Sequence, residues 1–471
     1  MKRFLLTLTM IAAALIATVG LADAAGTWGN AQTVTGFDAI GGTGDSNGSL
    51  IMCSAPGTCT VFGEYVTGNN YRAFTAVETN GVWGAASVIP SLDTLSAGSD
   101  VFFEFYDCAS QNSCVIAGLY GDGVGSKGFV YDTATDTAIE IPGLAALDVG
   151  LYTNVSSISC SSQGNCSLVG SYFDVSNVFQ AFTVDQVDGV WQSATPVTGM
   201  SSGGALNSVS CWADGECVAI GIDTGGSNDP VVVTRSGGTW GGAEAIPGIS
   251  GLSSAGGEGW AVSCSTGPVC VAVGTLDSPG ASPIFVTSLA NGVWSDASQL
   301  PSFTALTFWQ FPGINALSCW TPGNCLLSGT YNDAGIEKAW TAELVSGVWQ
   351  SAVPAPGMDA LSTNAFGLTG QSCASDGSCA LVGYYDDGTN YQGFVFNRNA
   401  DGTWSDAQPI PGLAALNIGG YGDPQDVSCV VGGCSATGWY QPSANGTAAF
   451  VVDMVTTPEP TPEPIAPAFT G

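Results

Sequence analysis

Along most of the chain, hydrophobic and polar residues alternate in short runs that predict β-strands. Between Ser156 and Val197 these runs are SSISC, CSLVGSY, AFTV and, after a Gly-x-Trp turn, GVWQSATPV. Runs of about four to six β-forming residues bounded by Gly, Asn, Asp or Pro are typical of strands, and helical spacing is absent beyond the N-terminal leader. The pattern therefore predicts a unit of four strands.

This unit recurs with two cysteines around the turn between its first and second strands. The leading cysteines are spaced 51 to 56 residues apart, and each partner follows six residues later, or five in the last pair. Cβ atoms that face each other across an antiparallel hairpin lie within disulfide reach. The predicted disulfides are Cys53–Cys59, Cys108–Cys114, Cys160–Cys166, Cys211–Cys217, Cys264–Cys270, Cys319–Cys325, Cys373–Cys379 and Cys429–Cys434.

Four strands in about 54 residues, repeated along a chain, are typical of a β-propeller blade. An isolated fourth strand, Gly26–Val34, comes first, and a triple that lacks a fourth strand, Cys429–Val455, comes last. Joined, the two pieces complete one blade. The sequence thus predicts an all-β, eight-bladed β-propeller in residues 25–455, closed by pairing of its terminal strands. The second unit has no tryptophan in Asp132–Gly143, so we expect a weaker outer strand in blade 2.

The two ends of the chain differ from the repeat. Residues 1–24 combine a basic start, an apolar run and the small-residue site Ala22–Ala24, which predicts a secretory signal, with an uncleaved membrane anchor as the alternative. Residues 456–471 alternate Pro with Glu and Thr, which predicts an extended spacer. Either the chain is truncated before an anchor segment or this tail hangs free.

Composition limits the compartment and the partners. Sixteen cysteines behind a secretory signal predict disulfides in a secreted, periplasmic or cell-surface protein. Zinc, the alternative, is disfavoured because the chain has no histidine and the cysteine spacing is long. A formal net charge of −32 repels phosphate backbones and anionic headgroups, so neither nucleic acid nor the membrane is an expected partner.

The paired-cysteine hairpin and the Gly-x-Trp turn, over residues 26–455, resemble those of secreted bacterial β-propeller repeat proteins. The chain is similar, more loosely, to the Asp-box turn of sialidase-like propellers. The nearest text is NADGTW, Asn399–Trp404, in which Asp401 and Gly402 are adjacent, so the Asp-box spacing is not met. We expect the repeated tryptophan to pack between neighbouring blades, with a ligand platform as the alternative.

Blade topology predicts two different faces. Cysteine hairpins and Gly-x-Trp turns share one face, whereas second-to-third loops and blade-to-blade linkers share the other. The second-to-third loops are rich in acids, which are ordinary turn formers and, in the sharper alternative, calcium ligands. The calcium candidates are Asp223, Asp229, Asp386 and Asp387.

The linkers depart most from the repeat, and they contain aromatic residues beside carboxylates. Such residues suit sugar rings, through stacking and hydrogen bonds to hydroxyl groups; packing within the channel is the alternative. The predicted ligand-binding residues are Glu104, Tyr106, Glu258, Trp260, Phe308, Trp309, Tyr421 and Asp423.

Catalysis has little support in the sequence. There is no histidine for proton transfer near neutral pH, and the cysteines are all taken by disulfides. Sialidase-type chemistry implies three converging arginines, whereas Arg72, Arg235 and Arg398 fall on different parts of the repeat. We therefore expect a non-enzymatic protein that binds a glycan or an extracellular protein. The alternatives are a polysaccharide hydrolase or lyase that uses carboxylates such as Glu104 and Glu258, and a structural envelope protein.

Overall fold

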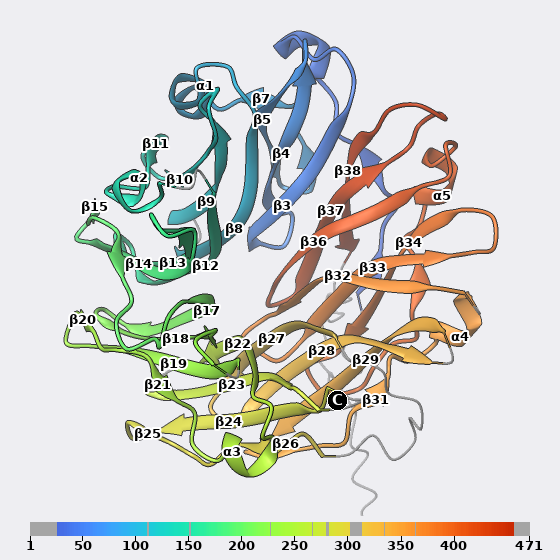
Figure 1. The fold of residues 1–471 in the computed structure, drawn as a ribbon. Coiled ribbons are helices and arrows are strands. Elements are labelled where there is room, and N and C mark those ends of the chain that lie inside the picture. The colour runs from blue at the N-terminus through green and yellow to red at the C-terminus, as the bar shows by residue number, and fades with distance from the viewer. Residues whose placement is uncertain are drawn as a thin grey trace, which may run out of the picture.

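The computed structural model describes residues 26–110, 113–149, 152–226, 228–265, 267–278, 282–301, 313–333, 335–362 and 364–455. Eight antiparallel sheets stand around a central axis, with each first strand innermost (Figure 1). The eight-bladed propeller predicted from the repeat is confirmed. The predicted signal and tail lie outside the described residues. None of the described helices is both long and apolar enough to cross a membrane.

The strands of each blade follow from the inside outward. Blades 1 and 2 comprise β3 (Ser46–Ala55), β4 (Thr58–Thr67), β5 (Asn70–Thr79), β6 (Val82–Trp83), β7 (Ser87–Val88), then β8 (Val101–Ser110), β9 (Ser113–Gly121), β10 (Ser126–Asp132) and β11 (Thr137–Glu140). Blades 3 and 4 comprise β12 (Thr153–Ser162), β13 (Asn165–Phe173), β14 (Phe179–Val187), β15 (Val190–Trp191), β16 (Thr195–Pro196), then β17 (Gly204–Ala213), β18 (Glu216–Asp223), β19 (Asp229–Ser236), β20 (Thr239–Trp240) and β21 (Glu244–Ala245). Blades 5 and 6 comprise β22 (Gly257–Cys264), β23 (Val269–Leu276), β24 (Ile284–Ala290), β25 (Val293–Trp294), β26 (Ser298–Gln299), then β27 (Gly313–Thr321), β28 (Asn324–Asp333), β29 (Ile336–Val345), β30 (Val348–Trp349) and β31 (Val353–Pro354). Blades 7 and 8 comprise β32 (Phe366–Cys373), β33 (Cys379–Asp386), β34 (Tyr391–Arg398), β35 (Gln408–Pro409), then β36 (Gly422–Val430), β37 (Gly433–Tyr440), β38 (Ala448–Val455), β1 (Thr27–Trp28) and β2 (Gln32–Thr33).

The ring closes as the repeat phase predicts. Both β1 and β2, from the start of the chain, pair antiparallel with β38 from its end. The Trp28 indole N–H donates to the Asn397 side-chain oxygen of blade 7 over 3.2 Å. One blade therefore contains both ends of the described chain, and the ring has no free outer edge at the point of closure.

Every blade carries the predicted disulfide. All eight pairs are bonded within the first hairpin, with Cα–Cα distances of 3.9 to 4.1 Å, and no cysteine is free. In blade 3, for example, Cys160 and Cys166 are direct partners in the strand register. Such closely packed disulfides indicate an oxidising environment.

The residue before the leading cysteine connects neighbouring inner strands. The Ser210 hydroxyl accepts a hydrogen bond from the Cys264 backbone N–H of the next blade, over 3.0 Å. Inner strands are sheet edges, and these rungs satisfy backbone donors that would otherwise face the channel. The other rungs of this kind run from Cys53 to Ser428, Cys160 to Asp107, Cys211 to Ser159, Cys319 to Ser263 and Cys429 to Ser372.

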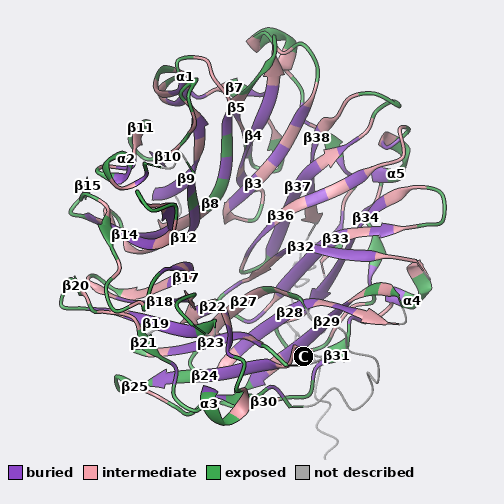
Figure 2. Ribbon diagram, viewed as in Figure 1, coloured by how far each residue is buried: buried purple, intermediate pink, exposed green. Residues whose placement is uncertain are grey.

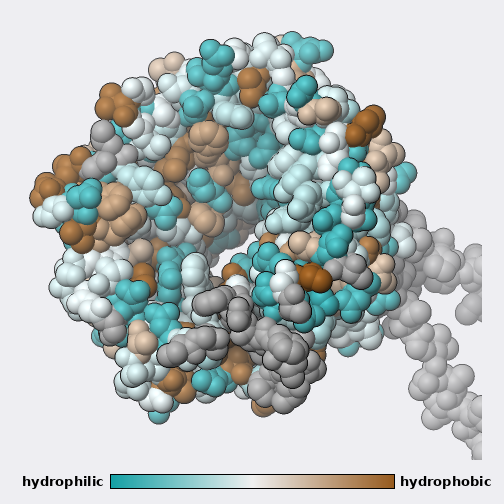
Figure 3. All heavy atoms as spheres, turned by 45° about the vertical axis from the view of Figure 1, so that its right-hand side comes forward, coloured by the Kyte–Doolittle hydropathy of each residue, from teal (hydrophilic) through white to brown (hydrophobic). Residues whose placement is uncertain are grey.

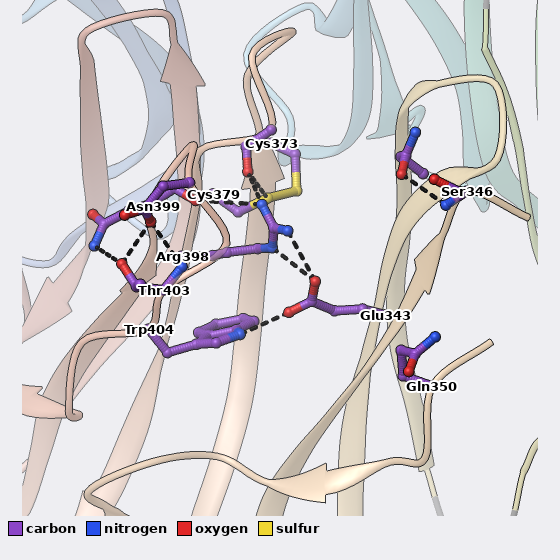
Figure 4. Close-up of polar contacts among 12 residues, drawn as sticks. Glu343, Ser346, Gln350, Cys373, Cys379, Arg398, Asn399, Thr403 and Trp404 are labelled. Atoms are coloured by element: carbon purple, nitrogen blue, oxygen red, sulfur yellow. Dashed lines mark hydrogen bonds and ion pairs between the residues drawn. A yellow bond between two sulfur atoms is a disulfide. The ribbon is translucent and has the colours of Figure 1, made fainter. Parts of the chain in front are cut away.

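The Gly-x-Trp tryptophans pack between blades, which confirms the packing prediction. In Figure 4, Trp404 of blade 7 points toward Glu343 of blade 6, and its indole N–H donates to Glu343 over 2.8 Å. Arg398 donates to the same carboxylate over 2.9 Å. Trp83 and Trp240 make the equivalent bond to an acid of the preceding blade. Their fixed position and polar partner make these rings structural.

Two expectations about local structure were wrong. Short helices α1 (Pro90–Ser96), α2 (Leu144–Leu147), α3 (Ile249–Leu252), α4 (Met358–Leu361) and α5 (Leu413–Leu416) follow outer strands, although the sequence shows no helical period. Such single turns are too short to produce one. The outer strand of blade 2 is not weak: β11 pairs over four consecutive residues with β10. Other outer strands break in two, and in blade 3 the N–H of Ala194, at the break, donates to the preceding linker.

Candidate ligand-binding site

One face of the ring gathers the irregular parts of every blade. Starts of first and third strands and ends of second strands lie there, opposite the disulfide hairpins; we call it the linker face. Buried segments run along the strands, whereas exposed residues concentrate in loops and at the outer rim (Figure 2). Figure 3 shows the hollow at the centre of the ring in a space-filling view.

A β-bulge occurs at the same place in all eight inner strands. In each blade the bulged residue stands four positions before the leading cysteine, as Glu104 does before Cys108. We call these residues the bulge ring: Ser49, Glu104, Ser156, Asn207, Trp260, Asn315, Thr369 and Gln425. Bulges turn a side chain out of the regular alternation, and they occur often at binding sites.

A glycine of the second strand makes room for each bulge. A Cβ atom on Gly170 would stand 2.1 Å from the Asn154 carbonyl oxygen and 2.9 Å from the Phe182 ring. Gly118 meets Phe102 and Phe129 in the same way in blade 2. The repeated glycine therefore lets the bulged inner strand approach the second strand while a buried ring packs behind it.

A cavity of about 530 Å³ opens at the channel among blades 1, 2, 7 and 8. Four bulge-ring residues line it, together with aromatic, acidic and amide groups. The lining residues are Asn47, Ser49, Leu50, Glu64, Phe102, Phe103, Glu104, Phe105, Tyr106, Thr369, Gln425 and Asp426. Two predicted residues, Glu104 and Tyr106, thus lie in one cavity. We call it the channel-mouth cavity.

Exposed rings and a carboxylate face this cavity from β8. Phe102 and Phe105 are 40% and 39% exposed, which is unusual for phenylalanine. Glu104 is exposed between them, and partial desolvation raises the pKa of its carboxyl group. Tyr106 is half-buried, and its hydroxyl donates to the Ile51 carbonyl oxygen over 2.6 Å. Tyr106 therefore shapes the wall, while Phe102, Glu104 and Phe105 are available to a ligand.

Glu64, which the sequence analysis missed, lies deeper in the same cavity. It is 5% exposed and accepts hydrogen bonds from the Phe103 backbone N–H over 2.9 Å and from the Ser49 hydroxyl. Burial is the largest effect on it and raises its pKa to about 7. In the sequence Glu64 occupies an ordinary alternating strand position, so no signal distinguishes it from a surface residue.

Asp426 forms the third acidic part of the wall. One of its oxygens accepts from the Ile51 N–H over 2.9 Å, and the other from its neighbour Val427 over 2.8 Å. Desolvation is the main cause that raises the pKa of Asp426 to about 7. Like Glu64, this residue connects two blades while it contributes acceptor oxygens to the channel.

Tyr421 and Asp423 belong to a separate aromatic group on blades 7 and 8. We call Tyr384, Tyr391, Tyr421 and Trp439 the tyrosine patch. Tyr421 stacks on Trp439 with ring centroids 5.1 Å apart, and Tyr391 lies 4.8 Å from Tyr421 on its other side. All four rings are half-buried. The patch and the cavity are neighbours, because Gln425 of the cavity hydrogen-bonds Asp423 beside the patch.

Asp423 carries an unsatisfied acceptor. Its Oδ1 atom is buried and has no hydrogen-bond partner in the described structure. Desolvation raises the pKa of Asp423 to about 7. Asn47 in the channel-mouth cavity likewise has a buried side-chain oxygen without a partner. Buried acceptors are normally satisfied, so a ligand with hydroxyl donors would complete both groups.

The remaining predicted ligand residues lie elsewhere. Glu258 and Trp260 are on blade 5, where Glu258 accepts from Asn207 over 2.9 Å and the Trp260 indole N–H donates to Thr275 over 3.0 Å. Neither residue lines the channel-mouth cavity, so Glu258 and Glu104 do not share that site. Phe308 and Trp309 lie outside the described residues.

The predicted calcium residues act as turn caps. Asp223 and Asp229 face each other at the end of blade 4, and Asp223 accepts from the Ser201 N–H over 2.8 Å. On blade 7, Asp386 accepts from Gly388, and Asp387 accepts from two turn N–H groups, each over 2.8 Å. Nowhere in the described ranges do three acidic, His or Cys side chains come together as a metal site. Calcium binding stays a prediction.

A larger cavity on the hairpin face has a structural explanation. It measures about 720 Å³ and lies between the hairpins of blades 1 and 2, against Val77, Tyr131 and Ala134. Blade 2 has no Gly-x-Trp tryptophan, so no ring fills this cleft as rings fill the others. Val77 is consequently 48% exposed. The cavity marks a missing structural side chain.

Every basic residue that the structure describes is committed to an ion pair. The pairs are Arg72–Asp93, Lys127–Asp122, Arg235–Asp185, Lys338–Asp333, Lys338–Asp359 and Arg398–Glu343. The three arginines lie in blades 1, 4 and 7, so they do not form a sialidase-type cluster. None of the basic residues lines the channel-mouth cavity.

Comparison with known proteins adds fold likeness alone. No family model and no curated protein matches the chain. A prolyl endopeptidase structure matches with 12% identity and a TM-score of 0.48, covering 84% of this chain and 53% of that one. A polysaccharide lyase matches with 12% identity and a TM-score of 0.46, covering 75% and 89%. The six-bladed fungal lectin of Aleuria aurantia matches with 12% identity and a TM-score of 0.35, covering 69% and 98%.

The chain spans about half the length of the prolyl endopeptidase. Enzymes and a lectin both stand among these matches, and fold does not imply function. The functional question therefore rests on the site itself.

Proposed function

We propose that this protein is a secreted or cell-surface, non-enzymatic propeller that binds a glycan at the channel-mouth cavity. The observation that carries the proposal is the combination of exposed Phe102 and Phe105 with the Glu104 carboxylate in one cavity of about 530 Å³. Aromatic faces attract the C–H groups of sugar rings, and carboxylate and amide oxygens accept hydroxyl protons.

The scaffold supports this reading. Sites on rigid strands are more precise than sites on loops, and Glu104 is held by a bulge within β8, whose inner edge is fixed by interblade hydrogen bonds. The bulge ring varies from blade to blade while the hairpin face repeats. Variation on a constant scaffold is expected where a protein distinguishes ligands.

The proposal predicts which substitutions weaken binding. A glycan array identifies a ligand, and calorimetry measures its dissociation constant for the disulfide-bonded protein. Phe105→Ala and Glu104→Gln should each weaken binding about tenfold or more, because one removes a stacking face and the other an acceptor charge. Val348→Ala is the matched control, since Val348 is 63% exposed on the hairpin face. Equal loss in all three variants, or none in the cavity variants, would contradict the proposal.

A polysaccharide hydrolase is the second candidate. Glu64, with a pKa near 7, and Glu104 line the same cavity, and two carboxyl groups of different pKa are the usual pair in glycoside hydrolysis. Both Glu64 oxygens, however, already accept hydrogen bonds from the scaffold. Binding is therefore favoured. Release of reducing ends from the bound glycan, abolished by Glu64→Gln, would establish the hydrolase instead.

A further inference from the structure

The channel-mouth cavity is flanked by aromatic groups on both sides around the ring. On the blade 8 side stands the tyrosine patch. On the blade 2 side Phe102, which lines the cavity, lies 5.5 Å from Tyr71, and Tyr71 is 41% exposed. The aromatic surface therefore continues past the cavity at both ends.

A third aromatic group extends the series to blade 3. Tyr152 is 53% exposed and lies 5.7 Å from Phe173 and 5.9 Å from Phe179. These residues stand at the start of a first strand, the end of a second strand and the start of a third. They occupy the linker face, as the tyrosine patch and the Tyr71–Phe102 pair do. In ring order the groups follow one another across blades 7, 8, 1, 2 and 3.

The hydrogen-bonding groups along this arc are acceptors. Glu64, Glu104 and Asp426 contribute carboxylates, and the side-chain oxygens of Asn47 and Asp423 include buried atoms without a partner. Donors are already used: the Tyr106 hydroxyl binds Ile51. A ligand complementary to this surface presents many O–H donors.

Charge excludes one large class of glycans. The net charge is −32, and each basic residue in the described ranges is neutralised by an acid of the same molecule. A uronate or sulfate group at the cavity would meet Glu104 and Asp426 with no cation to offset the repulsion. Neutral sugars have the required donors without that cost.

From these observations we infer that the ligand is a neutral polysaccharide whose chain lies along the linker face from the tyrosine patch, over the channel-mouth cavity, to Tyr152. The inference rests on the proposed glycan-binding function and adds the substrate class and its path. Successive sugar rings contact successive aromatic groups, so affinity depends on chain length. Several weak contacts along one chain act together because binding at one makes the next intramolecular.

The test measures dissociation constants for neutral gluco-, manno-, xylo- and galacto-oligosaccharides of two to ten residues. Polygalacturonate and a sulfated galactan are the polyanionic probes. At least one neutral series should bind at least tenfold more tightly at ten residues than at the shortest length that binds, and the polyanions should bind at least tenfold more weakly. Tighter binding of a polyanion, or affinity independent of length, would overturn the inference.

Variants locate the chain. Tyr391→Ala and Tyr152→Ala should each weaken the ten-residue ligand about tenfold and leave the short ligand unchanged. Trp260→Ala is the control, because Trp260 is 43% exposed but lies across the ring on blade 5. Loss of long-chain binding in Trp260→Ala together with its retention in Tyr391→Ala and Tyr152→Ala would refute this path. If short ligands bind but these variants have no effect, only the inference fails; if no glycan binds, the proposed function fails with it.

Discussion

At the scale of single residues, the repeat explains most positions and exposes the exceptions. Cysteine, the serine before it and the second-strand glycine each have one physical task that returns in nearly every blade. The ligand candidates Glu104 and Gln425 differ because the bulge position is free of such a task. That position could be recognised from sequence, since it always stands four residues before the leading cysteine. Glu64 could not, because its burial depends on a neighbouring blade.

Buried carboxyl groups predict an unusual pH dependence of stability. Folding raises the pKa of Glu64 from 4.5 to about 7, so the folded state binds more protons than the unfolded state between these values. The contribution is fully present below about pH 4.5 and is lost as pH rises through 7. Thermal unfolding should therefore show a lower melting temperature at pH 8 than at pH 5.

Glu64→Gln removes this titration while an amide oxygen still accepts the Phe103 N–H. Relative to the parent protein, the variant should gain stability between pH 5 and pH 8, on the order of 1–3 kcal/mol. Denaturant unfolding at both pH values measures the difference. A variant whose relative stability is the same at both pH values would show that Glu64 ionises normally in the fold.

At the scale of elements, strand pattern, hairpins and disulfides were all predictable, because a period of two and a cysteine pair are local signals. The break in each outer strand and the short linker helices were not. They depend on hydrogen bonds to the preceding blade, such as that of Ala194 to the Pro142 carbonyl. The strong outer strand of blade 2 follows from the same fact, since that strand has no such break.

The second-strand glycine provides a test of the inner sheet. Gly170→Ala places a methyl group against the Asn154 carbonyl oxygen and the Phe182 ring, which cannot both move. We expect a loss of at least 3 kcal/mol in the free energy of unfolding, above the usual cost of overpacking. Gly251→Ala is the control, because no atom lies within 4 Å of its added Cβ. Equal stability of the two variants in urea titration would contradict the close packing of the bulge.

At the scale of the whole molecule, closure was predictable from the phase of the repeat alone. The site was predictable only in part. Sequence placed Glu104, Tyr106, Tyr421 and Asp423 on one face, but it could not bring the first two into one cavity or the last two beside a stacked patch. Those groupings depend on which blades become neighbours after the ring closes.

Closure itself can be tested by truncation. Removing residues 26–34 deletes β1 and β2 and leaves the outer edge of β38 unpaired. The shortened protein should melt at a lower temperature and associate through that edge in size-exclusion chromatography. A monomer with unchanged melting would mean that the terminal strands do not hold the ring together.

The central claim is that a glycan binds on the linker face at the channel mouth. Hydrogen–deuterium exchange with and without a bound neutral oligosaccharide tests it most directly, because it maps contact without altering the protein. We predict slower exchange in β8 at residues 101–106 and in the segment 421–426, and no change in the disulfide hairpins. Protection confined to hairpins such as Cys160–Cys166, with none at residues 101–106, would place the ligand on the opposite face and contradict the account.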